Sequence, residues 1–498
     1  MGSHHAGRRA AAALLAGVLT TVALSTGLGW LAWGALVPLV VAIDGAPAGV
    51  VLAIAVLYTV VLGVGTVAPW LAPAIAAYFG LGLGRALAYT LVPLVAVSAA
   101  YGVVLGLLCL ARPRRVGVWS VVWWGAAWAA WEALRTIVFP YYPAAVLGVS
   151  QQAIPAALQA ASVGGIAAVS FVVVAFNAAV ASTFSRAPDA RRAAAAVIGI
   201  GIAVATVAWG RLRLASDADA VAGPRVVAVD VNARTRAAGT LDRYLAASAA
   251  ATADGPAIVL WPENALTADL EHDPAAWTAV TGFVTAHGAT LLTGGPAAAL
   301  VAGRGVVQFN AARLVAPSAA MQTYRKRGLV PFAERWPGLF GDPPPDLVSL
   351  EPGKEPTVLT AGDAAFGVLI CFEVTDARAA RALVAHGARF LVNLTNDAWF
   401  GEAPHLPWAA VRAVETGVPV VRAANAGVSA VFDRFGRRIA ARRSADGPSL
   451  LPARVPAAVP TIYARAGDAF LAGCIGVVLA GFVSAARTPR RTHRGQSS

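Results

Sequence analysis

Long apolar runs fill the first 212 residues of the chain, and they constrain its fold more than any other feature. A membrane-spanning helix needs about 20 mostly apolar residues. The whole chain is 58% hydrophobic and only 13% charged, whereas soluble proteins average about 25% charged residues. We therefore predict a polytopic α-helical membrane protein with about eight spans, near residues 11–28, 29–43, 48–70, 88–111, 116–138, 164–184, 193–210 and 469–486.

Basic residues predict the orientation of these spans. They cluster at residues 8–9, 112–115, 186–192 and 487–494. With eight spans all four clusters fall on one side of the membrane, and positive charge stays cytoplasmic. The clusters, together with an affinity for anionic lipid, account for most of the net charge of +13. No nucleic-acid partner is therefore expected.

Most of the charge lies between residues 213 and 460, which predicts a soluble domain. We expect three parts: a membrane domain with about seven helices (1–212), an extracytoplasmic domain (213–460), and a final helix with a basic cytoplasmic tail (461–498). Strands and helices alternate in the middle part, which predicts an α/β domain with covered sheets. The expected strands are 225–232, 257–263, 289–295, 306–315, 364–371, 388–395, 418–425 and 429–436, and the expected helices are 238–253, 274–287, 377–386 and 406–416.

Three candidate reactive residues lie at or near strand ends, where active sites of α/β domains gather. Glu263 ends "AIVLWPE", Cys371 ends "AAFGVLIC", and Lys326 follows strand 306–315 after a short turn. Lys326 and Lys354 are the only lysines beside 37 arginines. A lysine retained in such a chain suggests a task that needs a compact ammonium, although chance retention in a basic loop is the alternative.

These residue types together suit covalent catalysis. A thiol needs a base to become the thiolate that attacks a carbonyl, and Glu263 can serve as that base. Lys326 and the backbone N–H of Phe372 can donate to the oxyanion that forms. The alternative for Cys371 is an ordinary buried thiol, because free cysteine is often buried.

The other cysteines and the histidines suggest no further chemistry. Cys109 and Cys474 lie in predicted spans, so the chain has no disulfide framework. No Cys/His spacing indicates a zinc site, and we expect neither a metal nor a cofactor. His386 and His405 lie in no motif that would direct them at the thiol.

Several motifs together resemble one known family. In the outer domain they are "WPEN" (261–264), "YRKRGLVPFAE" (324–334), "ICFE" (370–373), "NLTNDAWFG" (393–401), "RAVETG" (412–417) and "VVRAANAGVS" (420–429). In the membrane half they are "FPYYPAAVLGVSQ" (139–151) and the segment 158–181. Their order and spacing resemble the apolipoprotein N-acyltransferases, the membrane-embedded branch of the nitrilase, or carbon–nitrogen hydrolase, superfamily.

The resemblance implies a fold, a location and a reaction. It implies an αββα nitrilase-like sandwich on the periplasmic side of a bacterial inner membrane, acting as a monomer. It also implies a ping-pong reaction in which Cys371 is the nucleophile, Glu263 the general base and Lys326 the oxyanion partner. The acyl donor would be a phospholipid, usually phosphatidylethanolamine. The acceptor would be the α-amine of a diacylglyceryl-cysteine apolipoprotein.

The resemblance also carries supporting residues and two departures. Glu334 and Glu373 match acids around the family's active site, and Trp399 matches an aromatic residue on a mobile loop near the lipid entry. Phe372 stands where the family usually has tyrosine, and Ala333 where it usually has glycine. These departures concern the acceptor preference and the rate.

Competing interpretations remain at this point. A membrane-tethered amidase or nitrilase would use the same triad with water as the acceptor, and a non-enzymatic scaffold or transporter would use none of it. Asp397 is expected in a turn and Arg422 in a structural role within a buried strand. Glu132 and Arg135 lie three residues apart in one predicted span and can pair there. Such a pair is a functional hint, but a structural role is equally compatible with the sequence.

Overall fold

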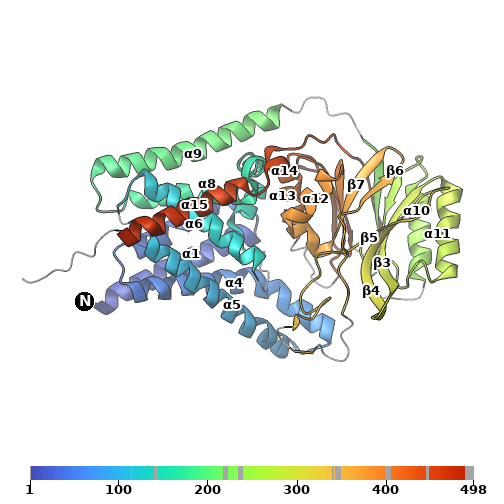
Figure 1. Cartoon of the computed structure of the whole chain (residues 1–498), viewed down its shortest axis with the longest axis horizontal. Coiled ribbons are helices and arrows are strands. Elements are labelled where there is room, and N and C mark those ends of the chain that lie inside the picture. The colour runs from blue at the N-terminus through green and yellow to red at the C-terminus, as the bar shows by residue number, and fades with distance from the viewer. Residues whose placement is uncertain are drawn as a thin grey trace, which may run out of the picture.

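The computed structural model describes residues 2–113, 115–138, 144–216, 223–233, 239–338, 341–342, 349–398, 405–444 and 448–487. They form a helical region, built from the N-terminal half and the last helix, and an α/β domain at one end of it (Figure 1). The predicted fold class is thereby confirmed.

Five helices of the described chain are long and apolar enough to cross a membrane. They lie within α1 (Gly2–Ser25), α4 (Ala48–Phe79), α5 (Leu83–Ala111), α8 (Ala161–Ser182) and α9 (Asp189–Ala215). Helix α4 follows Pro47 and ends at Gly80, whose φ of +62° suits a glycine cap. Short links join α4 to α5 and α8 to α9, and the two helices of each pair pack against each other.

The other three expected spans look different. The segment expected at 29–43 is not one helix but three short ones: η1 (Gly29–Leu31), α2 (Ala32–Ala35) and α3 (Val37–Ile43). Helix α6 (Val118–Ile137) carries two charged residues, and the apolar part of α15 (Ala469–Arg487) is short. The total of eight spans therefore stays a prediction.

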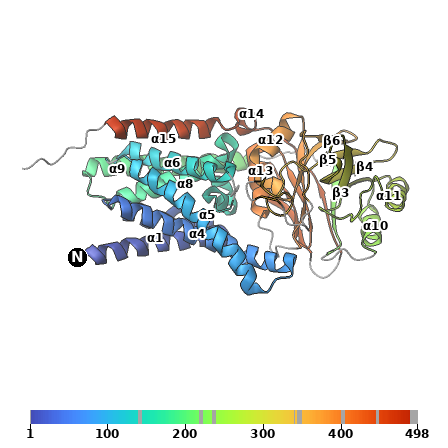
Figure 2. The same cartoon turned by 60° about the horizontal axis from the view of Figure 1, so that its bottom comes forward.

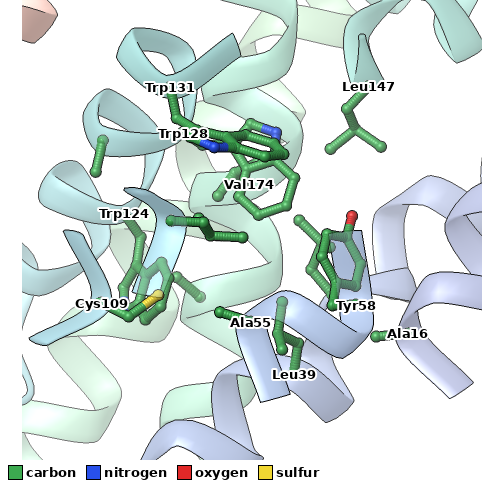
Figure 3. Close-up of a cluster of buried hydrophobic side chains, with 14 of the residues drawn as sticks. Ala16, Leu39, Ala55, Tyr58, Cys109, Trp124, Trp128, Trp131, Leu147 and Val174 are labelled. Carbon is green, nitrogen blue, oxygen red and sulfur yellow. The ribbon is translucent and has the colours of Figure 1, made fainter. Parts of the chain in front are cut away.

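Aromatic side chains fill the centre of the helical region (Figure 3). Trp128 of α6 packs edge-on against Tyr58 of α4, with ring centroids 5.8 Å apart, and against Trp131. Cys109 is buried in the same cluster, close to Trp124. These tryptophans pack the core of the helical region, and Cys109 lies among apolar groups of the same core.

The basic ends of two helices meet at the far end of this region. Arg9 of α1 donates to the carbonyl of Ala42 at 2.8 Å, and Arg112 donates to that of Ile43 at 3.0 Å. Both carbonyls lie at the C-terminal end of α3. The N-terminal end of α1, which carries Arg9, lies away from the α/β domain (Figures 1 and 2).

The α/β domain contains two six-stranded sheets packed face to face. The first has the order β12-β1-β2-β3-β4-β5, and the second β11-β10-β9-β8-β7-β6. Large apolar side chains such as Leu260 and Leu292 of the first sheet meet Phe366 and Val392 of the second. The strands are β1 (Arg225–Asp230), β2 (Ile258–Leu260), β3 (Thr290–Val301), β4 (Gly305–Val315), β5 (Gln322–Arg325), β6 (Val358–Ala361), β7 (Ala364–Ile370), β8 (Phe390–Asn396), β9 (Val420–Asn425), β10 (Val428–Phe432), β11 (Arg438–Arg443) and β12 (Ser449–Arg454).

Helices cover the outer face of each sheet, which makes four αββα layers. Helices α10 (Thr240–Ala251) and α11 (Pro274–His287) cover the first sheet, whereas α12 (Ala377–Ala385) and α13 (Leu406–Thr416) cover the second. The second pair faces the helical region, and Val169 of α8 shares one apolar core with Trp408 of α13 and Leu369 of β7. The apolar helices and the second sheet are therefore packed as one continuous body (Figure 2).

Candidate active site

Cys371 lies where strand β7 ends and a short 3-10 turn, Cys371–Thr375, begins. Its φ is +51°, a left-handed conformation that is uncommon for a residue with a side chain. Such a conformation costs about 1–2 kcal/mol relative to a right-handed one, so the surrounding structure must hold it. The side chain is buried at the carboxyl end of β7, against the apolar core between the two sheets.

Two carboxylates and one ammonium meet beside this turn. Lys326 Nζ donates to Glu263 Oε1 at 3.2 Å and to Glu334 Oε1 at 2.9 Å. Asn310 Nδ2 donates to the same two oxygens at 2.8 and 3.0 Å. The other oxygen of Glu263 accepts the backbone N–H of Asn396 at 3.1 Å. The cluster is thus held rigidly by elements from both sheets.

The local fold explains why these groups meet. Glu263 follows β2 and Lys326 follows β5, two parallel strands of the first sheet, while Cys371 follows β7 of the second. Gly294 on β3 lies so close to Glu263 that a Cβ there would be 2.7 Å from the Glu263 Cα. The site therefore forms where strand ends of the two sheets converge.

Burial and neighbouring charges set the protonation states. Burial raises the pKa of the Cys371 thiol and the Glu263 carboxylate raises it further, against the opposing effects of Lys326 and a hydrogen bond with Thr395. Burial acts to lower the pKa of Lys326, but the charges of Glu263 and Glu334 outweigh it and leave that pKa above its ordinary value. At neutral pH the site therefore holds a thiol and an ammonium, and the thiol needs a base at the moment of reaction.

Glu373 connects the cysteine turn to the segment after Lys326. Its Oε1 accepts the hydroxyl of Tyr324 at 2.8 Å and the backbone N–H groups of Arg327 and Gly328 at 2.8 and 2.9 Å. Its Oε2 accepts the N–H of Ile370 at 2.7 Å. Burial is the largest influence on the pKa of Glu373 and raises it, against these donors. Glu373 thus fixes the spacing between two parts of the site.

The remaining predicted residues differ in what the structure shows. The ring of Phe372 is partly buried and packs edge-on against His405, with centroids 5.6 Å apart. Burial and the nearby Arg422 lower the pKa of His405 to about 4, so this imidazole is neutral at pH 7. Trp399 lies outside the described residues.

Sequence reasoning missed Asn310, which bridges both carboxylates. The sequence feature that could have identified Asn310 is a polar amide within the apolar strand "VVQFNAARLV" (306–315). Within the described ranges, no group of three or more His, Cys, Asp or Glu side chains is arranged to hold a metal ion. Between the two carboxylates of this site, the Lys326 ammonium occupies the place where a cation would lie.

Comparisons with known proteins identify the family. A sequence model of the apolipoprotein N-acyltransferase N-terminal domain matches residues 16–179, and one of the carbon–nitrogen hydrolases matches residues 225–459. An apolipoprotein N-acyltransferase from Bradyrhizobium diazoefficiens is 31% identical over 375 residues, 67% of each chain. The chain belongs to the apolipoprotein N-acyltransferase family.

Other relatives extend the match. The apolipoprotein N-acyltransferase of Geobacter metallireducens is 28% identical over 460 residues, which is 85% of each chain. Among solved structures, an amidase from Nesterenkonia sp. aligns with 51% of this chain and 96% of its own, with a TM-score of 0.39 and 21% identity. As a member of the apolipoprotein N-acyltransferase family, the chain is an acyltransferase of a bacterial inner membrane. The carbon–nitrogen hydrolase match includes all the described site residues.

Proposed function

We propose that the enzyme moves an acyl chain from a phospholipid, phosphatidylethanolamine being the expected donor, to the α-amine of a diacylglyceryl-cysteine apolipoprotein. The observation that carries this proposal is the buried ammonium of Lys326, held between Glu263 and Glu334 beside a buried thiol. Such a group supplies a nucleophile, a base and an oxyanion donor in one place. The apolipoprotein acceptor is inferred from the relatives, which are named apolipoprotein N-acyltransferases.

In the first half-reaction Glu263 takes the proton of the Cys371 thiol as sulfur attacks the sn-1 ester carbonyl. The carbonyl oxygen gains a negative charge, which Lys326 Nζ and the Phe372 N–H stabilise. The tetrahedral intermediate collapses by breaking the ester C–O bond. The departing alkoxide takes the proton from Glu263, which leaves a thioester on Cys371 and a free lysophospholipid.

In the second half-reaction the lipoprotein α-amine attacks the thioester carbonyl. The same donors stabilise the second oxyanion, and Glu263 accepts the proton that the amine loses. The C–S bond then breaks, an amide forms, and the thiolate of Cys371 recovers the proton from Glu263. Because the raised pKa of Cys371 favours the thiol, the resting enzyme is restored.

Placement beside a membrane supports a lipid donor. Helices α12 and α13 contact the 3-10 turn that begins at Cys371. The same two helices share an apolar core with α8, so they connect the site to the apolar helices. We also propose that the α/β domain faces the periplasm and that one copy of the chain suffices. Arg9 and Arg112 gather at the end away from that domain, as positive charge retained in the cytoplasm would require. Residues 1–212, 213–460 and 461–498 remain the proposed functional division.

A transfer assay tests the donor and the acceptor together. The full-length protein in detergent would receive phosphatidylethanolamine with a tagged sn-1 acyl chain and a synthetic diacylated lipopeptide. We expect the tag on the lipopeptide amine with the wild type, and none with Cys371→Ala. Tag found only as free fatty acid would instead show a membrane hydrolase with water as acceptor. Tag that never leaves the phospholipid would refute the proposed donor.

A further inference from the structure

A buried polar chain contacts the backbone at the Cys371 end of strand β7. It consists of Asn393 on β8, Arg422 on β9 and Asp397 just after β8, all with no exposed surface. None of these side chains contacts Glu263 or Lys326 among the hydrogen bonds of the described residues. A charge buried at this depth must be paired and hydrogen-bonded. The partners of Arg422 and Asp397 therefore show what this chain holds in place.

Asn393 holds the backbone at the end of strand β7. It lies opposite Leu369 in the parallel ladder between β7 and β8. Its Nδ2 donates to the carbonyl of Leu369 at 2.9 Å and to that of Cys371 at 3.2 Å. The ladder itself ends at the pair Ile370 and Leu394, so a side chain binds the first carbonyl beyond it.

Arg422 determines which way the amide of Asn393 faces. Arg422 Nη1 donates to Asn393 Oδ1 at 2.6 Å, which leaves the Nδ2 donors directed at the two carbonyls. Arg422 Nη2 donates to both carboxylate oxygens of Asp397, at 2.9 and 2.7 Å. This charged pair has no exposed surface and fixes the guanidinium, and through it the amide.

The carbonyl that Asn393 holds belongs to the peptide group whose N–H comes from Phe372. A trans peptide is planar, and its C=O and N–H point in opposite directions. Fixing the Cys371 carbonyl therefore fixes the direction of the Phe372 N–H, the proposed second oxyanion donor. Cys371 has a positive φ, so this peptide would otherwise be free to relax toward a commoner conformation.

We propose that Asn393 and Arg422 are positioning residues that orient the Cys371–Phe372 peptide so that its N–H faces the developing oxyanion. The inference rests on the proposed function, since it concerns the acylation of Cys371. It assigns a catalytic consequence to Arg422, which the sequence placed only in a structural role, and to Asn393, which stood out in the sequence only as part of "NLTNDAWFG" (393–401). Neither side chain touches the substrate in this account, because both act through the peptide.

The test compares two reactions of the same thiol. Acylation by phosphatidylethanolamine passes through an oxyanion, whereas alkylation by iodoacetamide displaces iodide directly and forms none. Asn393→Asp keeps the acceptor that faces Arg422 and replaces the donor that faces Cys371. Arg422→Lys keeps the charge beside Asp397 and loses the contact with Asn393. Both variants would be made in the full chain, with labels located at Cys371 by peptide mass spectrometry.

The chain offers a matched control for a buried amide. Gln159 is fully buried, donates to the carbonyls of Pro155 and Phe435 at 2.9 and 3.0 Å, and accepts from Arg213 Nε at 3.1 Å. Gln159→Glu therefore makes the same chemical change, with the same kind of partners, away from the cysteine turn. Thermal unfolding of the two variants shows how much of any effect is lost stability alone.

We expect the first-turnover acylation rate to fall about tenfold to 100-fold in Asn393→Asp and Arg422→Lys, less than complete loss of one oxyanion donor. We expect alkylation of Arg422→Lys at about pH 9 to stay within about twofold of the wild type, because this variant keeps the net charge near the thiol and leaves its base in place. Asn393→Asp adds a negative charge near the thiol, so its alkylation rate is not used as a criterion. Gln159→Glu should retain both rates.

Two results would overturn the inference: unchanged acylation in both variants, or parallel loss of acylation and alkylation in Arg422→Lys. If Asn393→Asp does not fold, the acylation and alkylation rates of Arg422→Lys alone test the inference. A wild type that forms no acyl-enzyme would refute the proposed function and the inference with it, whereas failure of the inference alone appears only in the variants.

Discussion

The helical region and the α/β domain each bury a carboxylate near a cation, but the two groups are built differently. In α6 of the helical region, Glu132 accepts hydrogen bonds from Trp128 Nε1, the Leu147 N–H and the Ser170 hydroxyl, at 2.8, 2.7 and 2.6 Å. It stays 4.0 Å from Arg135. Its oxygens are therefore occupied by donors that join α6 to α8 and to the 3-10 helix η2 (Leu147–Ala153).

In the α/β domain the cation and the carboxylates touch directly. Lys326 lies within 3.2 Å of Glu263 and 2.9 Å of Glu334. The charges of Glu263 and Glu334 outweigh burial and raise the pKa of Lys326. The difference teaches that a buried charge pair does not mark chemistry by itself. The proposed reactivity of the α/β site rests on direct contact of Lys326 with Glu263 and Glu334, beside a thiol that can become a nucleophile.

The largest effect should follow from exchanging the cations of the two clusters. Lys326→Arg replaces a compact ammonium by a wider planar fork in a site that leaves only 1% of Lys326 exposed. We expect acyl transfer to fall by at least about 100-fold, as for the loss of an oxyanion donor. The measurement is the initial rate of tag transfer to the lipopeptide.

The reciprocal exchange, Arg135→Lys, is the matched control. Arg135 donates to the carbonyls of Ala144 and Ala145 through two nitrogens, which one ammonium cannot reproduce equally well. We expect lower thermal stability but transfer within about twofold of the wild type, because the charge remains. Equal loss of activity in both exchanges would remove the contrast between the clusters.

The second prediction concerns the reactivity of the thiol in the resting enzyme. Burial and Glu263 raise the pKa of Cys371, so its proton stays on as the pH rises past the ordinary thiol value of about 8.5. We expect alkylation by iodoacetamide at about pH 8 to be at least about tenfold slower than for a model thiol, and to keep rising at higher pH. Peptide mass spectrometry across a pH series measures it. A rate that levels off below neutral pH would show a thiolate in the resting site.

The third prediction tests the connection made by Glu373. Glu373→Gln would direct an NH₂ group at backbone N–H donors, since four donors share the two oxygens of the carboxylate. We expect an activity loss of about tenfold and a stability loss of about 1–3 kcal/mol, the cost of unpaired buried polar groups. Transfer rate and thermal unfolding would be measured together. Stability loss without activity loss would make Glu373 a purely structural residue.

The smallest effect on catalysis should come from Glu132→Gln. The amide keeps the shape of the side chain but meets three donors with one oxygen, so the free energy of unfolding should fall by about 1–3 kcal/mol. Transfer should stay within about twofold, because no reacting group changes. A loss of transfer near that of Lys326→Arg, in protein that remains folded, would give the membrane pair a catalytic role.

Parts of the fold could be predicted closely because local chemistry specifies them. Helices α11 and α13 occupy the expected residues 274–287 and 406–416. Asp273 caps α11 by accepting from the N–H groups of Ala275 and Ala276, and Gly288 ends it in a left-handed conformation. A cap, a starting proline and a closing glycine are all visible in the sequence.

Other elements could not be found this way. Strands β5 and β6 are four residues long, and β11 is an arginine-rich edge strand with most of its residues exposed. Strand β12 pairs with β1 across more than 200 residues of chain. Such strands are specified by partners distant in sequence and carry little periodic signal of their own.

The candidate site also contains residues that the sequence could indicate and residues that it could not. The residues Glu263, Lys326 and Cys371 stand out as rare types at strand ends, but their roles remain proposals that the structure supports through contact and burial. Asn310 depends on the register that places it opposite Lys326. Asp397 was expected in a turn, yet it is fully buried against Arg422. These contacts arise only when strands from different parts of the chain pair.

The measurement that tests the central claim most directly is the capture of the acyl-enzyme. Full-length protein in lipid nanodiscs would receive phosphatidylethanolamine of defined acyl chains without any acceptor, followed by acid quenching and peptide mass spectrometry. The account predicts one acyl chain on the peptide that carries Cys371, sensitive to neutral hydroxylamine, with an equal amount of lysophospholipid lacking its sn-1 chain. Transfer to a lipopeptide in the same preparation, without any acylated Cys371 before the acceptor is added, would contradict it.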